Sequence, residues 1–185
     1  MEMIKLPQSL AQHKKRIVSA NGTEIIWHRA MQETEKACVT LSTHLIVLVV
    51  RGAKEVYSPA GKLSIGPGEG FFLKAGNYLM TEKLLHEQRF ESLTIFFPST
   101  VASALSQLLP LASVSAVATP DIFRIEQSAA LDTFAHSLLH YAEMDSNETE
   151  AAFLVDAKLR ELFWILLRTP GADGFAHVLR GLQSS

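Results

Sequence analysis

The hydrophobic period of the chain changes at Pro98, and this change restricts the fold more than any other feature of the sequence. Between residues 24 and 97 the apolar runs are short, β-branched or aromatic, and broken by turn residues about every eight to twelve positions, which indicates a β-sandwich or barrel. Beyond Pro98, apolar residues recur at steps of three and four, as in an amphipathic helix. The sequence therefore predicts an α+β protein, with a β-barrel over residues 1–98 and a helical region of two to three helices over residues 99–185.

Individual strands and helices follow from the same patterns. Residues 44–50 are apolar without a break, which is expected of a central strand buried on both faces. Residues 90–97 alternate, so one largely apolar face is expected to pack inward. The predicted strands are residues 23–29, 37–41, 44–50, 54–58, 62–65, 71–74, 78–83 and 90–97. The predicted helices are a short one at 102–109, capped by Ser99 or Thr100, and then, after a connector at 111–119, helices at 131–142, 148–168 and 175–182.

The charge balance does not suit a domain that grips nucleic acid by itself. The formal net charge is −2, from 17 Lys and Arg against 19 Asp and Glu, whereas such a domain normally carries a basic face. The basic run at residues 13–16 is short and is expected to be a solvated tail. Any contact with DNA is therefore expected from a part of the protein outside these residues.

Redox chemistry and membrane insertion also lack support. Cys38 is the only cysteine, so no disulfide can form within the chain, and its strand-like surroundings favour a small buried hydrophobic side chain. The N-terminus has no apolar signal region. The longest apolar run, residues 45–50, is far shorter than the roughly 20 residues that cross a bilayer. We expect a cytoplasmic protein.

No catalytic motif stands out. There is no Gly-x-Ser-x-Gly elbow, and the glycine-rich turn at residues 66–70 lacks the Lys-Ser/Thr pair of a phosphate-binding loop. His136 and His140 are spaced like two zinc ligands on a helix, but Ser137 stands where a catalytic Glu would follow, and no third ligand is evident. We therefore expect no catalytic residues, no metal site and no cofactor.

The region from residue 44 to residue 97 resembles a known regulatory barrel. The resemblance lies in an apolar strand ending at Gly52, a hairpin, the corner Leu63-Ser64-Ile65-Gly66-Pro67-Gly68-Glu69, the strand at 71–73, the turn Ala75-Gly76 with Tyr78 after it, and a last strand ending Ile95-Phe96-Phe97. This pattern resembles the N-terminal domain of AraC/XylS-type transcription regulators, a cupin-like barrel of the jelly-roll type. The helical region resembles the segment that joins this barrel to the DNA-binding helix-turn-helix domain. The subgroup it most resembles is the ExsA-like activators of type III secretion genes, whose N-terminal domains bind a protein anti-activator.

One departure from the wider cupin pattern bears on chemistry. Metal-binding cupins carry a His-x-His pair on an early strand and a further His after the second glycine turn. Here His44 stands at the first position of that pair, but Ile46 stands at the second. Asn77 and Tyr78 occupy the place of the further His. A centre with three His ligands therefore has no source in this sequence.

The resemblance implies a domain that senses an effector or a regulatory protein, forms a homodimer, and controls DNA binding by a C-terminal domain absent from this chain. The alternatives are a stand-alone cupin enzyme or small-molecule-binding barrel, and a pure interaction scaffold. Candidates for an effector pocket are the aromatic and His residues of the strands, although strand aromatics also serve as plain core: Trp27, His28, Tyr57, Phe71, Tyr78 and Phe96. Candidates for a dimer interface lie on the helix at 148–168, which is apolar nearly all round at residues 162–167: Leu154, Leu162, Phe163, Ile165 and Leu166.

Overall fold

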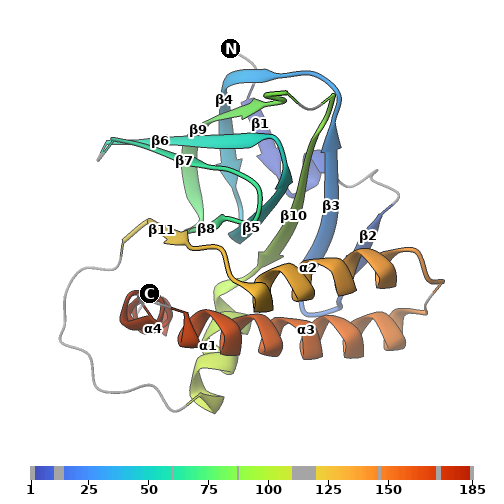
Figure 1. The fold of residues 1–185 in the computed structure, drawn as a ribbon. Coiled ribbons are helices and arrows are strands. Elements are labelled where there is room, and N and C mark those ends of the chain that lie inside the picture. Colours follow the sequence, from blue (N-terminus) through green and yellow to red (C-terminus); the bar gives the residue numbers. More distant parts are fainter. Residues whose placement is uncertain are drawn as a thin grey trace.

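A computed structural model describes residues 3–10, 15–59, 61–86, 88–109, 120–145, 147–169 and 172–183. Across these residues two β-sheets face each other and a layer of helices covers one of them (Figure 1). The elements are β1 (Met3–Leu6), the 3₁₀ turn η1 (Gln8–Leu10), β2 (Arg16–Val18), β3 (Glu24–Ala30), β4 (Thr34–Leu41), β5 (His44–Arg51), β6 (Ala53–Ser58), β7 (Gly61–Ile65), β8 (Gly70–Leu73), β9 (Gly76–Lys83), β10 (Phe90–Phe97), α1 (Ser99–Leu108), β11 (Ile122–Ile125), α2 (Ala129–Ala142), α3 (Glu148–Arg168) and α4 (Ala172–Gln183).

The first sheet has the strand order β1-β4-β9-β6-β7, and the second has the order β11-β8-β5-β10-β3-β2. Every pairing is antiparallel except the one between β1 and β4. All eight predicted strands are confirmed, within a few residues at their ends. Strands β1, β2 and β11 were not predicted, because each is only three or four residues long and has no clear alternation.

The second sheet is buried on both of its faces. In β10, Phe90 and Phe96 pack between the two sheets, whereas Leu93, Ile95 and Phe97 pack against the helices. The prediction that one face of residues 90–97 packs inward is therefore confirmed, and the other face is buried as well. Because the helices cover the outer face of this sheet, its central strands need apolar residues at every position, as the unbroken run in β5 shows.

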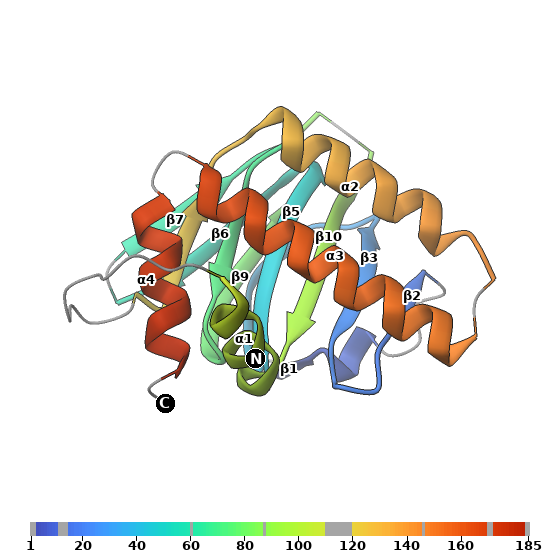
Figure 2. The same ribbon diagram turned by 90° about the horizontal axis from the view of Figure 1, so that it is seen from below.

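The helices form the third layer, and α2 and α3 cross the outer face of the second sheet (Figure 2). Helix α3 has the predicted bounds and begins with a capping box between Asn147 and Glu150. Helix α1 begins after Pro98, and neither Ser99 nor Thr100 caps it as expected. The four helices predicted by residue range are confirmed, within a few residues at their ends, and three of them follow the connector, as the predicted region of two to three helices requires.

Some sequence predictions lie outside the described residues, namely the connector at 111–119 and the first half of the basic run at 13–16. The division of the chain at residue 98 stays a prediction, although strand β11, from beyond that point, pairs with β8 in the second sheet. No helix in the described part of the chain has both the length and the apolar character needed to cross a membrane.

Candidate effector site

The space between the two sheets contains a partly enclosed cavity of about 170 Å³. Strands from both sheets and the N-terminal segment supply its walls, which are mostly aliphatic and include Leu6, Val39, Leu45, Val47 and Met80. These side chains point inward because the alternation of each strand directs every second residue toward the facing sheet. The cavity is therefore a product of the barrel itself.

Three ionisable side chains lie together at this mostly apolar cavity, besides the hydroxyl groups of Thr34 and Thr94. Lys54 and Glu82 are directly paired across β6 and β9, with Lys54 Nζ 2.6 Å from Glu82 Oε1. His28 Nε2 lies 3.1 Å from Glu82 Oε2, so the imidazole N–H donates to the carboxylate. Lys54 Nζ also stands 5.5 Å from the centre of the Phe90 ring, a cation–π contact.

The electrostatics of this cluster keep Glu82 ionised. Burial alone would raise the pKa of Glu82, but the charge of Lys54 and the hydrogen bond from His28 outweigh burial and hold that pKa well below its usual range. Lys54 and Glu82 therefore neutralise each other. The cavity offers hydrogen-bonding groups at this cluster without a net charge for a ligand to neutralise.

His28 is the one predicted pocket residue that lines this cavity. Lys54 and Glu82 were not predicted as site residues. Each lies in a segment predicted to be a strand, but only the register between β6 and β9 makes them partners, and sequence alone does not give that register.

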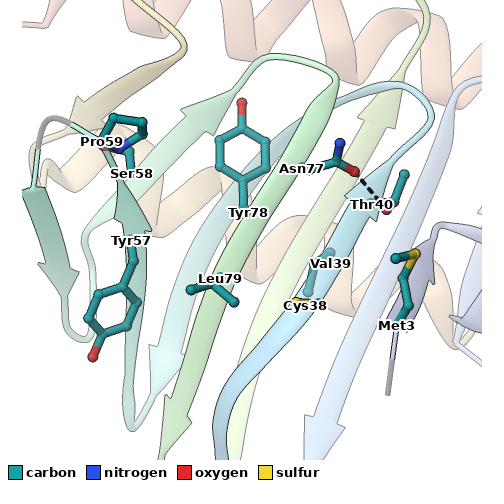
Figure 3. A pocket seen from close by; sticks show the side chains of 10 residues that line it. All are labelled: Met3, Cys38, Val39, Thr40, Tyr57, Ser58, Pro59, Asn77, Tyr78 and Leu79. Atoms are coloured by element: carbon teal, nitrogen blue, oxygen red, sulfur yellow. Dashed lines mark hydrogen bonds between the residues drawn. The ribbon is translucent and has the colours of Figure 1, made fainter. Parts of the chain in front are cut away.

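Tyr57 and Tyr78 line a different hollow, an open groove of about 370 Å³ (Figure 3). The register of the first sheet sets Met3, Cys38, Leu79 and Tyr57 side by side across it. The Tyr78 hydroxyl donates to the Lys74 carbonyl oxygen at 2.6 Å, and burial, aided by the charge of Asp121, raises the pKa of Tyr78 to about 12. Cys38, expected to be buried, is half-buried in this groove.

The remaining three pocket candidates are core residues. Phe71 and Phe96 are fully buried between the sheets, and Trp27 belongs to the core between the second sheet and the helices. The six candidates are thus spread over both faces of the second sheet and the open groove, and they do not form one cradle. Their role in effector binding stays a prediction.

The dimer candidates lie mainly inside the protomer. Leu162, Phe163, Ile165 and Leu166 are buried in the core that joins the helices to the second sheet, and Leu154 is partly buried against it. The nearly all-apolar stretch of α3 is explained by contacts with the sheet and its neighbouring helices. The large apolar side chains that α3 exposes are Phe153, 80% exposed, and Trp164, 53% exposed.

The histidines considered as metal ligands do not face a common site. His28 faces the cavity between the sheets, whereas His44 packs against Phe72 and Phe97 on the helix side of the second sheet. His136 Nδ1 donates to the Asp132 carbonyl oxygen at 2.7 Å. Within the described residues no group of three or more His, Cys, Asp or Glu is placed to hold a metal ion.

A cupin-like double sheet with helices packed on one face defines the class of N-terminal regulatory domains found in AraC-type transcription regulators. The family model of the ExsA N-terminal regulatory domain matches residues 44–178, and the chain belongs to this family. No curated protein sequence matches the chain. The predicted AraC-type and ExsA-like resemblance is confirmed.

Solved structures with a similar fold include ToxT from Vibrio cholerae. An apo form from strain SCE256 has a TM-score of 0.56 at 8% identity, over 78% of this chain and 56% of that chain. Wild-type ToxT from the same strain, bound to an unsaturated fatty acid, has a TM-score of 0.52 at 10% identity, over 87% and 60%. The AraC-like transcriptional activator CuxR gives 0.47 at 14% identity, over 76% and 50%. This chain thus spans little more than half the length of the ToxT structures.

Proposed function

We propose that this chain is the effector- or partner-sensing and dimerising part of a cytoplasmic AraC-type transcription regulator. DNA binding would belong to a C-terminal helix-turn-helix domain outside these residues. The observation that carries the proposal is the cavity between the sheets, because it borders the same second sheet whose other face holds the helices. A ligand there can favour one arrangement of the helices only if it binds that arrangement more tightly.

The size and polarity of the cavity favour a small, mostly apolar, uncharged effector with one hydrogen-bonding group. A volume of about 170 Å³ is close to that of apolar cavities of roughly 150 Å³ that hold benzene. An unsaturated fatty acid is bound in ToxT, but here the one lysine at the cavity is already paired with Glu82. A long carboxylate would therefore find neither the length nor the cation that it needs.

Indole is a suitable probe of this site, because it is an uncharged apolar ring system with one N–H donor. We expect indole to raise the thermal unfolding midpoint of the chain, since a ligand of the folded state alone stabilises it. Ala37 lines the cavity, so Ala37→Leu should fill it and abolish the rise. Ala130→Leu, the same change at an exposed position at the start of α2, should leave the rise intact. An equal rise in both variants would contradict a ligand site in the cavity.

The dimer interface is proposed on the outer face of α3 instead of on the buried residues first considered. Phe153 and Trp164 are eleven residues apart, which places them on the same side of the helix about 16 Å apart. Exposed aromatic side chains of this size are common anchors of protein interfaces. A second copy of the chain would cover both residues by pairing α3 with its symmetry mate.

Sedimentation equilibrium tests the dimer. We expect the wild-type chain to dimerise, and Phe153→Ser with Trp164→Ser to raise the dissociation constant at least about tenfold, a loss of about 1.4 kcal/mol or more. The matched control is Leu108→Ser on α1, which also removes an exposed apolar side chain. A wild-type chain that stays monomeric at all concentrations would overturn this part of the proposal.

The stand-alone enzyme remains a distinct alternative, and metal analysis of the purified chain discriminates it from the regulator. An enzyme of the metal-dependent cupin type would hold zinc, iron or manganese in a stoichiometric amount and lose it in His28→Ala or His44→Ala. Those two residues face opposite sides of the second sheet, so one ion cannot bind both.

A further inference from the structure

A third hollow, of about 270 Å³, lies between the second sheet and helix α2, on the opposite side of that sheet from the cavity. Its floor is formed by β3, β5 and β10, and its wall by Ala135, His136 and Leu139 of α2 and by Glu143, the C-cap of that helix. Lys15 also lines it. This arginine groove, as we call it, is separate from the cavity between the sheets because the second sheet stands between the two.

Three arginines surround one carboxylate in this groove. Arg29 and Arg51 are the cross-strand neighbours of Glu91 on either side, and Arg89 precedes it by two positions and so shares its face. Arg29 Nε and Arg89 Nε lie 2.7 and 2.9 Å from Glu91 Oε1, and Arg51 Nε lies 3.4 Å from Glu91 Oε2. The side chain of Glu91 is only 5% exposed, whereas each arginine side chain is roughly 40% exposed.

The groove carries an excess of positive charge in a chain of negative net charge. Among the described residues, its lining includes four cations, Lys15, Arg29, Arg51 and Arg89, against two anions, Glu91 and Glu143, a balance of +2 over those residues. The chain as a whole carries −2. Arg51 has a further interaction besides its contact with Glu91, but Arg29 and Arg89 share the single carboxylate of Glu91, and like charges this close repel one another unless a further anion joins them.

The donors needed by such an anion are present. Within the described residues, Glu91 Oε1 has no hydrogen-bond partner, so its contacts with Arg29 and Arg89 are ion pairs without hydrogen-bond geometry. Trp27 also lines the groove, and no described residue accepts a hydrogen bond from its buried indole N–H. A buried donor without an acceptor is costly and gains from a ligand that supplies one.

We propose that the arginine groove binds a small ligand through an oxyanion group such as a phosphate or pyrophosphate. Guanidinium groups match this chemistry because their planar N–H donors bind phosphate oxygens in pairs. A volume of about 270 Å³ accommodates a phosphorylated metabolite and not a macromolecule. Such a ligand contacts the sheet through the arginines and α2 through its wall, so it joins the barrel to the helical layer.

Pyrophosphate is the probe for this site, and the two tryptophans of the chain give the readout. Trp27 lines the groove, whereas Trp164 lies on the exposed face of α3. In a ¹H–¹⁵N spectrum of the chain at constant ionic strength, pyrophosphate should shift the indole N–H signal of Trp27 in a saturable way. The signal of Trp164 should stay in place. Movement of neither signal, or equal movement of both, would overturn the proposal.

Three variants make the test specific. Arg89→Gln removes one donor and leaves Glu91 two arginines, so it should weaken pyrophosphate binding about tenfold. Arg160→Gln, an exposed arginine of α3 paired with Asp156, is the matched control and should not change binding. Glu91→Gln should strengthen binding, because it releases the arginines from a competing carboxylate.

The effect of Glu91→Gln separates a binding site from a structural ion-pair cluster. A purely structural cluster would be weakened by every one of its substitutions and would show no gain in pyrophosphate affinity. Unchanged dispersion of both indole signals verifies that each variant is folded. If folded Glu91→Gln binds pyrophosphate less tightly than the wild-type chain, or if Arg89→Gln and Arg160→Gln behave alike, the arginine groove is not an oxyanion site.

Discussion

His44 connects three segments of the chain at a single buried side chain. Its Nδ1 accepts a hydrogen bond from the backbone N–H of Ala75 at 3.0 Å, and its Nε2 donates to Ser99 Oγ at 2.7 Å, where α1 begins. Only the neutral imidazole with its proton on Nε2 can make both bonds. Burial, and after it the charge of Lys74, lowers the pKa of His44 to about 4.

This depressed pKa predicts a loss of stability in mild acid. As the pH falls from 6.5 to 4, an unfolded His44 gains a proton while the folded one does not, so the free energy of unfolding falls by about 3 kcal/mol over that window. Urea unfolding at a series of pH values measures this slope, and His44→Gln should remove most of it. A slope unchanged in His44→Gln would contradict the assignment.

A different group acts at lower pH. Hydrogen bonds from Lys83 and then Tyr57 lower the pKa of Glu55 to about 2, so the stability that this carboxylate contributes is lost only as the pH falls below 4.5. The pH range in which His44 gains its proton lies almost wholly above the range in which Glu55 does. The change in the free energy of unfolding above pH 4.5 can therefore be assigned to His44 and not to Glu55.

The pair of Lys54 and Glu82 predicts strongly non-additive mutations. Lys54→Met leaves a buried carboxylate without its cation and should lower the free energy of unfolding by about 3 kcal/mol or more. Adding Glu82→Leu removes the stranded charge and should recover a large part of the loss. Urea unfolding of the single and double variants gives both values, and simple additivity would show that the two side chains do not interact.

Among the elements, helix α4 packs closely against strand β11 because Gly174 of α4 has no side chain. A Cβ built on Gly174 would lie 2.4 Å from Phe123 Cε2, and the ring of Phe123 in turn lies 6.0 Å from that of Phe175. The ring of Phe175 stands edge-on to Phe163 of α3. One glycine thus allows two helices and a strand to share an aromatic cluster.

Gly174→Ala should therefore destabilise the chain by about 1–3 kcal/mol through overpacking, although alanine itself favours a helix by about 1 kcal/mol. Thermal unfolding measures the loss. Phe123→Leu in the same chain should relieve the clash, so the double variant should be more stable than the sum of the single changes predicts. A stabilised Gly174→Ala would show that α4 does not pack closely on β11.

The elements that sequence predicts best are those that carry their own signal. The bounds of α3 follow from its helical period and from Asn147 and Glu150, which cap it locally. Strand β5 is recognisable because the two cores that it separates make it apolar throughout. Strand β11 has no such signal, because it exists through its pairing with β8.

Site residues could be predicted only where they depend on local sequence and not on strand register. His28 is a candidate because it lies on a predicted strand whose side chains can line the barrel, and it does line the cavity. The ion pair of Lys54 and Glu82 and the arginine row around Glu91 depend on strand registers, which follow from tertiary packing and not from local sequence. The buried dimer candidates were misplaced because sequence does not reveal which neighbours a helix packs against.

In the whole molecule, the second sheet lies between the cavity on one side and the arginine groove and the helices on the other. Its inner face closes the cavity with His28 and Thr94, and its outer face carries Leu93 and Ile95 against the helical layer. Helix α3 crosses this outer face as part of that layer (Figure 2), and it exposes Phe153 and Trp164. A change in the cavity is thus separated from the proposed dimer surface by one sheet and one helix.

A chimera tests whether this chain assembles a DNA-binding protein into its active dimer, as proposed. The chain would replace the dimerisation domain of a repressor whose DNA-binding part occupies its palindromic site only as a dimer, with a reporter gene as the readout. We expect the wild-type chain to restore repression, and Phe153→Ser with Trp164→Ser to reduce it while the protein remains folded. A folded wild-type chimera that fails to repress, or a double variant that represses as well as the wild type, would contradict the account.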